Sequence, residues 1–377
     1  LLLLAYLLLA SDRRRWAKAG LLSLLLLALS TWWLVDRLSG NGIDAATLYH
    51  LQAGMQGAGI GDFSGDIARF LALALLSLLP LALVPLLRGR LQRFRGRHPR
   101  RAVDAAFAAS FVVAILASPL YADARRLQRH FAPVDAEGVA AEYRLPQGNL
   151  AQRRNIVWIY AESLERTYLD ASVFPGLMPN ITRLARDGLD FRDIASTEGA
   201  GWTIAGMVAS LCGVPLTTAR GDENSLGRMR EFLPGAQCLG DYLGGQGYRN
   251  VFLGGADAGF AAKGRFLERH GYGEVRDFAH YRAAGIAPQH FSEWGLHDDV
   301  LLDDAFDTFL QLSSAGAPFM LTTLTMDTHH PAGHLPVACR DTRYDSPLGD
   351  IGLLHALKCT DVLISRLIDR IRNSPYA

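Results

Sequence analysis

A threonine stands at the start of a helix-like, uncharged stretch of the sequence, GAGWTIAGMVASLCGVPL at residues 199–216. The hydroxyl of Thr203 has two interpretations. As a helix N-cap it would satisfy a free backbone N–H, and on sequence alone this is the simpler interpretation. As a nucleophile it would gain from the helix N-terminus, which stabilises an alkoxide and an incoming phosphate.

Two further residues have the chemistry that a nucleophilic threonine needs. Glu162 follows the apolar run NIVWIY, and His329 stands a few residues after the run PFMLTTL. A divalent metal held by carboxylate and imidazole ligands would lower the pKa of a hydroxyl and polarise a phosphoryl oxygen. Together the three residues favour metal-assisted phosphoryl transfer.

The segments that must position these residues alternate between strand-like and helix-like patterns. The expected strands are NIVWIYAES, YRNVFLGG and PFMLTTLTMDTHHP, and the expected helices include MPNITRLARDG and DDVLLDDAFDTFLQL, the latter with Asp298 as its N-cap. This alternation predicts an α/β domain with a mostly parallel sheet covered by helices on both faces. Glu162 and His329 then lie beyond the carboxyl ends of strands, where active sites form in such sheets.

The first third of the chain has the pattern of a membrane anchor. Half of the 377 residues are hydrophobic, and the runs at 19–35, 70–87 and 102–122 each approach the about 20 apolar residues of a bilayer span. Buried helices of a soluble protein are a poor alternative for three such runs so close together. Residues 1–10 resemble the end of a fourth span, and because the chain opens there without a Met, we expect a fragment of a longer protein.

Arginine-rich loops predict how these spans are oriented. Residues 11–18 and 88–101 are rich in arginine, whereas residues 36–68 are rich in glycine and weakly acidic. Loops rich in Lys and Arg stay in the cytoplasm, so we expect residues 123–377 to lie outside it. A nucleic-acid binder is disfavoured by the net charge of +1.

All four cysteines fall in the part expected outside the cytoplasm. They are Cys212, Cys238, Cys339 and Cys359. An even number in an oxidising compartment favours two disulfides. Three pairings are possible, of which proximity favours Cys212 with Cys238 and Cys339 with Cys359, and buried free thiols are the alternative.

Several motifs in order carry a resemblance to a known family. They are NIVWIYAESLERTYLD, FPGLMPNITRLARDGLDF, GWTIAGMVASLCGVPL, WGLHDDVLLDDAF and LTTLTMDTHHP. With the spans they resemble the phosphoglycerol transferase I family of Gram-negative bacteria, a membrane-anchored branch of the alkaline phosphatase and sulfatase superfamily related to lipoteichoic acid synthase. We therefore expect transmembrane helices at 1–122 (four spans, the first incomplete), a juxtamembrane linker at 123–150, and an extracytoplasmic, sulfatase-like catalytic domain at 151–377, incomplete at its C-terminus.

The resemblance also implies a reaction. Family members take the phosphoglycerol head group from phosphatidylglycerol and place it on periplasmic glucans, leaving diacylglycerol in the membrane. A glycerophosphoryl-threonine would form, with one divalent metal ion (manganese, magnesium or zinc) and no nucleotide. The protein would be a multi-pass protein of the bacterial inner membrane, with its catalytic domain in the periplasm.

The same resemblance assigns roles to individual residues. Glu162 would be a metal ligand, Thr203 the metal-bound nucleophile, and His329 a contact to the substrate phosphate. Lys263 in FAAKGRF would grip the phosphoglycerol, although Ala261 stands where lipoteichoic acid synthase has an aromatic residue. His330 would either support the site or be a simple surface histidine. The remaining metal ligands, an Asp-His pair, are expected beyond residue 377, so we expect the chain as it stands to be inactive and of low stability.

Two other functions remain open on the sequence. A phosphoethanolamine transferase of the same superfamily would use the same threonine with a pocket for an ammonium head group. A membrane protein without catalytic activity, whose outer domain binds glycans or a partner, would have an incomplete metal site.

Overall fold

The structure, a computed structural model, describes residues 2–10, 15–53, 59–86, 100–132, 143–145, 148–195, 201–216 and 231–377. The chain forms two compact units. The anchor unit comprises residues 1–51 and 63–134, and the sheet unit comprises residues 52–62 and 135–377.

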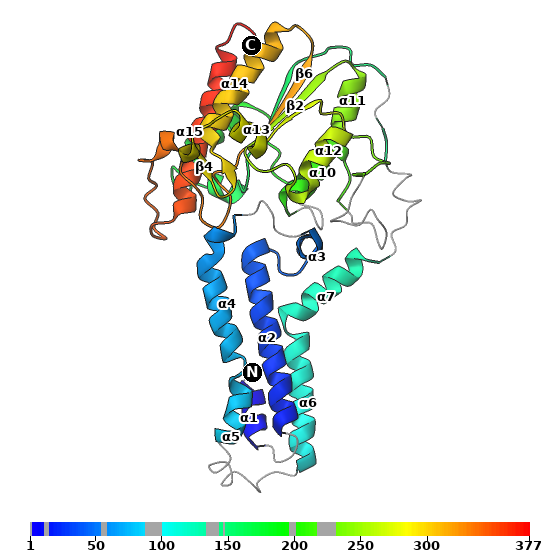
Figure 1. Cartoon of the computed structure of the whole chain (residues 1–377), viewed down its shortest axis with the longest axis vertical. Helices are drawn as coiled ribbons and strands as arrows, with labels where there is room; N and C mark the ends of the chain where they lie inside the picture. Colours follow the sequence, from blue (N-terminus) through cyan, green and yellow to red (C-terminus); the bar gives the residue numbers. More distant parts are fainter. Residues whose placement is uncertain are drawn as a thin grey trace. The chain divides into compact units, whose positions relative to one another are not determined.

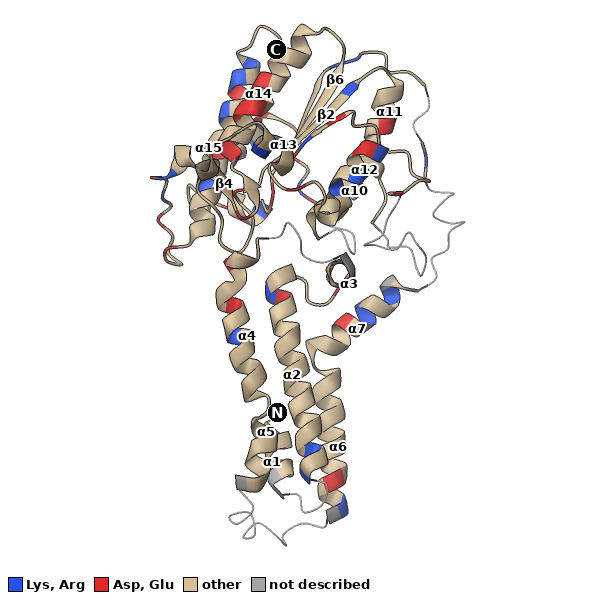
Figure 2. Ribbon diagram, in the orientation of Figure 1, with Lys and Arg blue, Asp and Glu red and all other residues tan. Residues whose placement is uncertain are grey.

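Helices make up the described secondary structure of the first 134 residues (Figure 1). They are α1 (Leu2–Ala10), α2 (Arg15–Ser39), α3 (Ala45–Ala53), η1 (Ile60–Phe63), α4 (Ser64–Leu76), α5 (Leu79–Leu86), α6 (Arg100–Leu116) and α7 (Pro119–His130). Among the described residues, the helices Arg15–Ser39 and Ile60–Pro85 are long and apolar enough to cross a membrane. Figure 2 shows that the middle of α2 carries no charged side chain. The expected spans 19–35 and 70–87 coincide with these two helices for most of their length.

The third expected span, 102–122, is not one straight helix. α6 ends at Leu116, and α7 begins at Pro119 with a bend of 56° between the two helices. Ser118 has an extended conformation, because the residue before a proline is pushed out of the helical region. The fourth expected segment, 1–10, is helical as α1, while the arginine-rich residues 11–14 and 87–99 lie outside the described residues.

The sheet unit is built on a four-stranded parallel sheet. Its strands are β1 (Ile156–Tyr160), β2 (Arg249–Gly254), β3 (Glu274–Arg276) and β6 (Phe319–Leu324), in the order β1-β6-β2-β3. A short antiparallel hairpin joins β4 (Phe291–Ser292) to β5 (Gly295–Leu296). The helices are η3 (Arg166–Leu169), α9 (Pro179–Asp187), α10 (Thr203–Cys212), α11 (Leu239–Gly245), η4 (Phe260–Ala262), α12 (Lys263–Arg269), α13 (Phe278–Ala283), η5 (Pro288–His290), α14 (Asp298–Ser314), η6 (Val337–Cys339) and α15 (Gly352–Arg372).

Helices cover the sheet on both faces, as the sequence predicts. In Figure 1, α14 and α15 lie on one side of the sheet, and α11 and α12 lie on the other. Alternate residues of β2 point to opposite faces of the sheet. Val251 and Leu253 pack in the core with α14 and α15, whereas Phe252 packs edge-on against Tyr272. Every residue of β6 is buried, as expected for a central strand of a parallel sheet.

Candidate active site

A hydroxyl and a carboxylate meet beyond the carboxyl end of β1. Glu162 lies two residues after this strand, and Thr203 is the first residue of α10. The Thr203 Oγ1 donates a hydrogen bond to Glu162 Oε2 at 3.0 Å. The N-cap position of α10 belongs to Trp202, so the interpretation of Thr203 as a helix cap is wrong. Its hydroxyl is directed at the carboxylate instead of a backbone N–H.

Two threonines after β6 hold the backbone of Glu162 in place. The Glu162 N–H donates to Thr325 Oγ1 at 3.0 Å, and Thr328 Oγ1 donates to the Glu162 carbonyl at 2.5 Å. Both contacts arise because β1 and β6 run side by side in parallel, which brings the residues after each strand to one edge. The backbone from which the Glu162 carboxylate reaches Thr203 is therefore fixed by the sheet.

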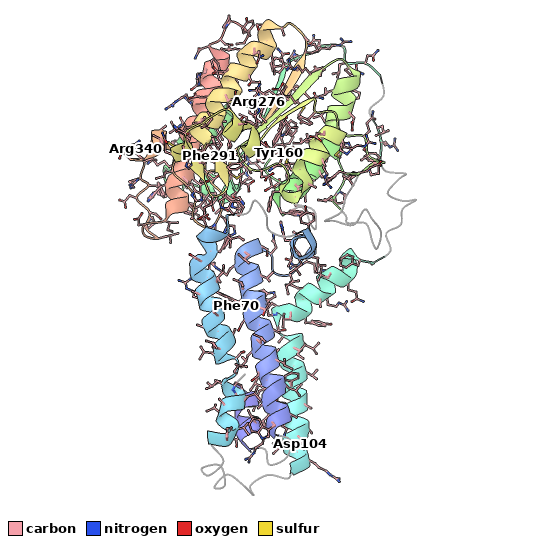
Figure 3. All side chains as sticks on the ribbon, viewed as in Figure 1. Phe70, Asp104, Tyr160, Arg276, Phe291 and Arg340 are labelled. Atoms are coloured by element: carbon pink, nitrogen blue, oxygen red, sulfur yellow. A yellow bond between two sulfur atoms is a disulfide. The ribbon has the colours of Figure 1, made fainter. Side chains whose placement is uncertain are left out.

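A half-buried tyrosine and a disulfide fix the helix that carries Thr203. Tyr160, the last residue of β1 (labelled in Figure 3), shares a hydrogen bond of 2.7 Å with Ser210 Oγ of α10. Burial raises the pKa of Tyr160 to about 12, so this hydroxyl stays protonated at neutral pH. At the same C-terminal end of α10, Cys212 is bonded to Cys238, the N-cap of α11.

His329 lies in the turn that follows β6, packed against an aromatic ring. Its Nδ1 is 2.8 Å from the His330 carbonyl, and its ring stacks on Trp294 with centroids 3.6 Å apart. Burial lowers the pKa of His329, and the negative charge of Glu162 partly opposes that shift. The ring of half-buried His330 is nearly parallel to that of His329, with centroids 6.3 Å apart.

Lys263 begins α12 and is 4% exposed. Burial lowers the pKa of its ammonium group, while the carboxylates of Glu162, Asp257 and Asp277 oppose the shift. Glu162 thus interacts electrostatically with both Lys263 and His329. The Glu162 carboxylate therefore interacts with three further residues that have predicted roles, Thr203, Lys263 and His329, and the roles themselves stay predictions.

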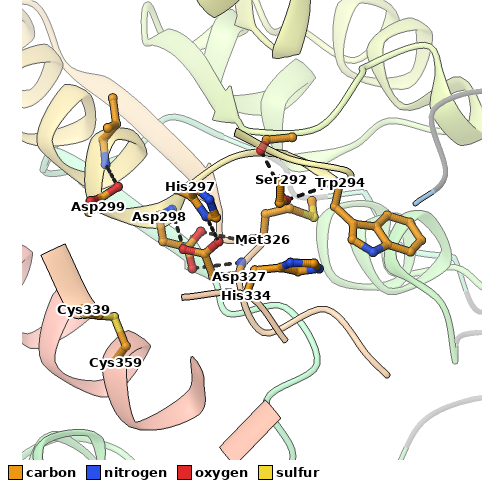
Figure 4. A network of polar contacts seen from close by, with 12 residues as sticks. Ser292, Trp294, His297, Asp298, Asp299, Met326, Asp327, His334, Cys339 and Cys359 are labelled. Atoms are coloured by element: carbon orange, nitrogen blue, oxygen red, sulfur yellow. Dashed lines mark hydrogen bonds and ion pairs between the residues drawn. A yellow bond between two sulfur atoms is a disulfide. The ribbon is translucent and has the colours of Figure 1, made fainter. Parts of the chain in front are cut away.

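Two buried aspartates, Asp298 and Asp327, tie α14 to the loop after β6 (Figure 4). Asp298 accepts hydrogen bonds from the backbone N–H of Met326 at 2.6 Å and of Asp327 at 3.2 Å. In return Asp327 accepts from the Asp298 N–H at 2.8 Å and pairs with His297 Nδ1 at 2.5 Å. Burial raises the pKa of both carboxyl groups.

These reciprocal hydrogen bonds between Asp298 and Asp327 correct one prediction, and they add Asp327 to the residues near the site. The N-cap of α14 is His297, so the prediction of Asp298 as N-cap is wrong: the carboxylate accepts hydrogen bonds from the loop after β6 instead of from its own helix. Asp327 stands two residues before His329, and the sequence patterns assign it no role. A carboxylate two residues before paired histidines, in the motif MDTHH, is the signal that could have found it.

A second group of possible metal ligands is structural. Among the described residues, Cys238, Asp241 and His270 place one ligand atom each within 4.8 Å of one another. The Cys238 sulfur is in a disulfide and is no thiolate, and Asp241 accepts from the Cys238 N–H at 2.9 Å as part of a capping box. The oxygens of Glu162 and Thr203 form a better donor pair, because hard divalent cations prefer oxygen ligands.

The second disulfide lies away from these residues. Cys339 of η6 is bonded to Cys359 of α15. Both pairings are those that proximity in the sequence favours, and the chain has no free cysteine.

The chain matches two family models. Residues 1–136 match "Phosphoglycerol transferase I, N-terminal domain", and residues 154–376 match "Sulfatase".

Curated relatives named phosphoglycerol transferase I match along nearly the whole chain. The protein from Xanthomonas euvesicatoria pv. vesicatoria is 64% identical over 376 residues, which are 100% of this chain and 53% of the relative. The protein from Salmonella arizonae is 34% identical over 378 residues, which are 97% of this chain and 48% of the relative. The chain therefore spans about half the length of the curated relatives it matches.

Two solved structures are similar in part. An alkaline phosphatase superfamily protein from Vibrio parahaemolyticus is 24% identical with a TM-score of 0.48, covering 61% of this chain and 52% of that one. The lipoteichoic acid synthase LtaP from Listeria monocytogenes is 14% identical with a TM-score of 0.47, covering 59% of this chain and 53% of that one.

Proposed function

Because the chain belongs to the sulfatase family, in the branch that carries the N-terminal domain of phosphoglycerol transferase I, we propose that it takes part in phosphoglycerol transfer. The donor is phosphatidylglycerol, the acceptor is a periplasmic glucan, and diacylglycerol is released. The observation that carries the proposal is the 3.0 Å hydrogen bond from Thr203 to Glu162. This contact supports the proposal because a hydroxyl that could act as a nucleophile faces a carboxylate at the carboxyl edge of the sheet.

The reaction proceeds in two displacements. The Thr203 hydroxyl loses its proton as its oxygen bonds to the phosphorus of the donor, while the bond from phosphorus to the diacylglycerol oxygen breaks and that oxygen takes up a proton. A glucan hydroxyl then loses its proton as its oxygen bonds to the same phosphorus, while the bond from phosphorus to the Thr203 oxygen breaks and the threonine regains a proton. Two exchanges of similar phosphate esters need no nucleotide as an energy source.

Glu162 and Thr203 are the residues proposed to hold one divalent metal ion, manganese, magnesium or zinc. When bound, such an ion lowers the pKa of the hydroxyl and polarises a phosphoryl oxygen. Lys263 and His329 contact the phosphate, and both interact with the charge of Glu162. The histidine Nδ1 is engaged with the His330 carbonyl, which leaves Nε2 for the substrate.

The proposed location is a bacterial inner membrane, with several passes and the sheet unit in the periplasm. Two helices suited to crossing a membrane support the anchoring. The two disulfides of the sheet unit support an oxidising compartment. A membrane-anchored enzyme on that side meets its lipid donor by diffusion in the plane of the bilayer.

The test uses the natural gene product that contains this chain, in vesicles with labelled phosphatidylglycerol or phosphatidylethanolamine. We expect diacylglycerol release from phosphatidylglycerol, complete loss in Thr203→Ala, and partial activity in Thr203→Ser, which keeps a hydroxyl. Thr167→Ala, at an exposed threonine of η3, is the matched control and should match the wild type.

Each alternative has its own outcome in this experiment. A Thr203→Ala variant within a few-fold of wild type would show that Thr203 is not the nucleophile. Release from phosphatidylethanolamine alone would indicate a phosphoethanolamine transferase. Release from neither lipid would favour a protein that binds glycans without catalysis.

A further inference from the structure

A short segment from the first third of the chain is built into the sheet unit. Residues Gly59–Asp62 stand just before α4 in the sequence, yet they belong to the sheet unit. Asp62 Oδ2 accepts hydrogen bonds from Trp294 Nε1 at 3.0 Å and from His334 Nε2 at 2.9 Å. The segment is also fastened through the Gly61 N–H, which donates to Glu293 Oε2 at 2.8 Å.

The two glycines of this segment allow a close approach to the hairpin between β4 and β5. A Cβ atom at Gly59 would lie 2.6 Å from Trp294 Nε1, and one at Gly61 would overlap the Glu293 carboxylate. A side chain at Gly59 would therefore displace the buried Trp294 indole or the segment, whereas at Gly61 the exposed Glu293 carboxylate could move aside. The close fit thus requires glycine at Gly59.

Both partners of Asp62 support the turn that carries His329. The Trp294 ring stacks on the His329 ring at 3.6 Å with an interplanar angle of 22°. The backbone N–H of His334 donates to the Asp327 carbonyl at 2.7 Å, which closes the turn after His329. Figure 4 shows Trp294 and His334 beside the network of His297 and Asp327.

We infer that Asp62 is a positioning residue of the proposed active site. It holds the Trp294 indole in plane, and the indole holds the His329 imidazole where it meets the substrate phosphate. The Asp62 side chain is 13% exposed and that of His334 is 19% exposed, and hydrogen bonds to a charged acceptor in such surroundings are among the stronger ones. The inference rests on the proposed function, because only that function gives His329 a phosphate to bind.

A double-mutant cycle on the natural gene product tests this coupling. The rate constant kcat/KM for phosphoglycerol transfer is measured for the wild type, Asp62→Ala, His329→Ala and the double variant. We expect Asp62→Ala to lower kcat/KM by about tenfold to a hundredfold, because a small displacement of a binding group is costly. In the His329→Ala background the same change should cost less than about twofold.

Two further variants distinguish a role of Asp62 in positioning His329 from a role in only attaching the segment Gly59–Asp62 to the hairpin. Asp62→Asn keeps an oxygen that accepts from Trp294 and should restore part of the activity. Glu293→Ala removes the other fastening of the segment without touching the stacked rings, and should stay within about threefold of the wild type. A loss in Glu293→Ala equal to that in Asp62→Ala would show docking alone and overturn the inference.

A spectroscopic readout works without turnover. In protein labelled with 5-fluorotryptophan, the ¹⁹F resonance of Trp294 is assigned by its absence in Trp294→Phe. We expect this resonance to shift in both Asp62→Ala and His329→Ala. An unchanged resonance in Asp62→Ala would overturn the inference.

The two failures are distinguishable. No transfer by the wild type would refute the proposed function, whereas transfer with additive losses in the cycle would refute the positioning role only. Full activity in His329→Ala would refute both the role of His329 and the inference.

Discussion

At the scale of single residues, Lys263 combines a charge with burial that ordinarily opposes it. At 4% exposure the ammonium group has lost most of its hydration, and burial lowers its pKa against the pull of three carboxylates. Because burial outweighs the carboxylates in lowering this pKa, an apolar side chain of similar volume at this position removes the net cost of burying the charge. Because burying this ammonium group lowers the stability of the fold, we expect Lys263 to contribute to substrate binding instead.

The corresponding prediction uses Lys263→Met. We expect the melting temperature to stay equal or rise, while KM for phosphatidylglycerol rises by about tenfold or more, because one charged phosphate contact is lost. Lys263→Arg keeps the charge and serves as the control. We expect its KM to lie between those of the wild type and Lys263→Met. Thermal melts and donor titrations measure both effects, and a lower melting temperature with unchanged KM would contradict the assignment.

The residue types of the site could be predicted from the sequence, but their hydrogen-bond partners could not. Glu162, Thr203 and His329 stand where strands or helices begin and end, which a pattern can locate. Thr203 and Asp298 both looked like helix caps, because Thr and Asp at a helix start are usually caps. Which group each side chain reaches is decided by strand pairing across more than a hundred residues, as between Glu162 and Thr325.

At the scale of elements, the two disulfides close loops of similar length but hold different helices. Cys212–Cys238 separates its cysteines by 26 residues and fastens α10, whereas Cys339–Cys359 separates them by 20 and fastens α15. Loops of this size predict similar stabilisation, about 3 kcal/mol each. Only the first disulfide touches the helix on which Thr203 stands.

We therefore predict that two paired serine replacements differ in activity more than in stability. Cys212→Ser with Cys238→Ser and Cys339→Ser with Cys359→Ser should each lower the free energy of unfolding by a similar amount. At a temperature where both variants are folded, the first pair should lose more transfer activity, because α10 is free to shift from Glu162. Denaturant unfolding and transfer assays measure the two quantities, and equal activity in both variants would argue against a role of this disulfide in placing Thr203.

Periodicity and hydropathy predict some elements and miss others for physical reasons. β1, β2, β6, α9 and α14 are long enough to show a pattern, and the structure confirms them. β3 has three residues, and β4 and β5 have two each, too few for a period. Hydropathy also joined α6 to α7, because it does not register the backbone restriction that Pro119 imposes on Ser118.

At the scale of the whole molecule, the orientation of the chain in the membrane is open to a direct test. All four native cysteines are in disulfides, so a single added cysteine is the one free thiol. In cells with a permeabilised outer membrane, a membrane-impermeant maleimide should label Val173→Cys, whose side chain is 44% exposed. Arg95→Cys, in the arginine-rich loop, should react only after lysis, because that loop is expected in the cytoplasm. The reverse pattern would contradict the proposed topology.

The segment Gly59–Asp62 restricts how this protein can be recombined. A chimera that joins residues 135–377 to a foreign membrane anchor would omit Asp62, and the Trp294 indole N–H, in a side chain only 7% exposed, would lose its acceptor. A buried donor left without a partner costs about 1–3 kcal/mol. The sheet unit thus cannot be cut at residue 135 without loss: an anchor from another protein must supply a new acceptor for the Trp294 N–H.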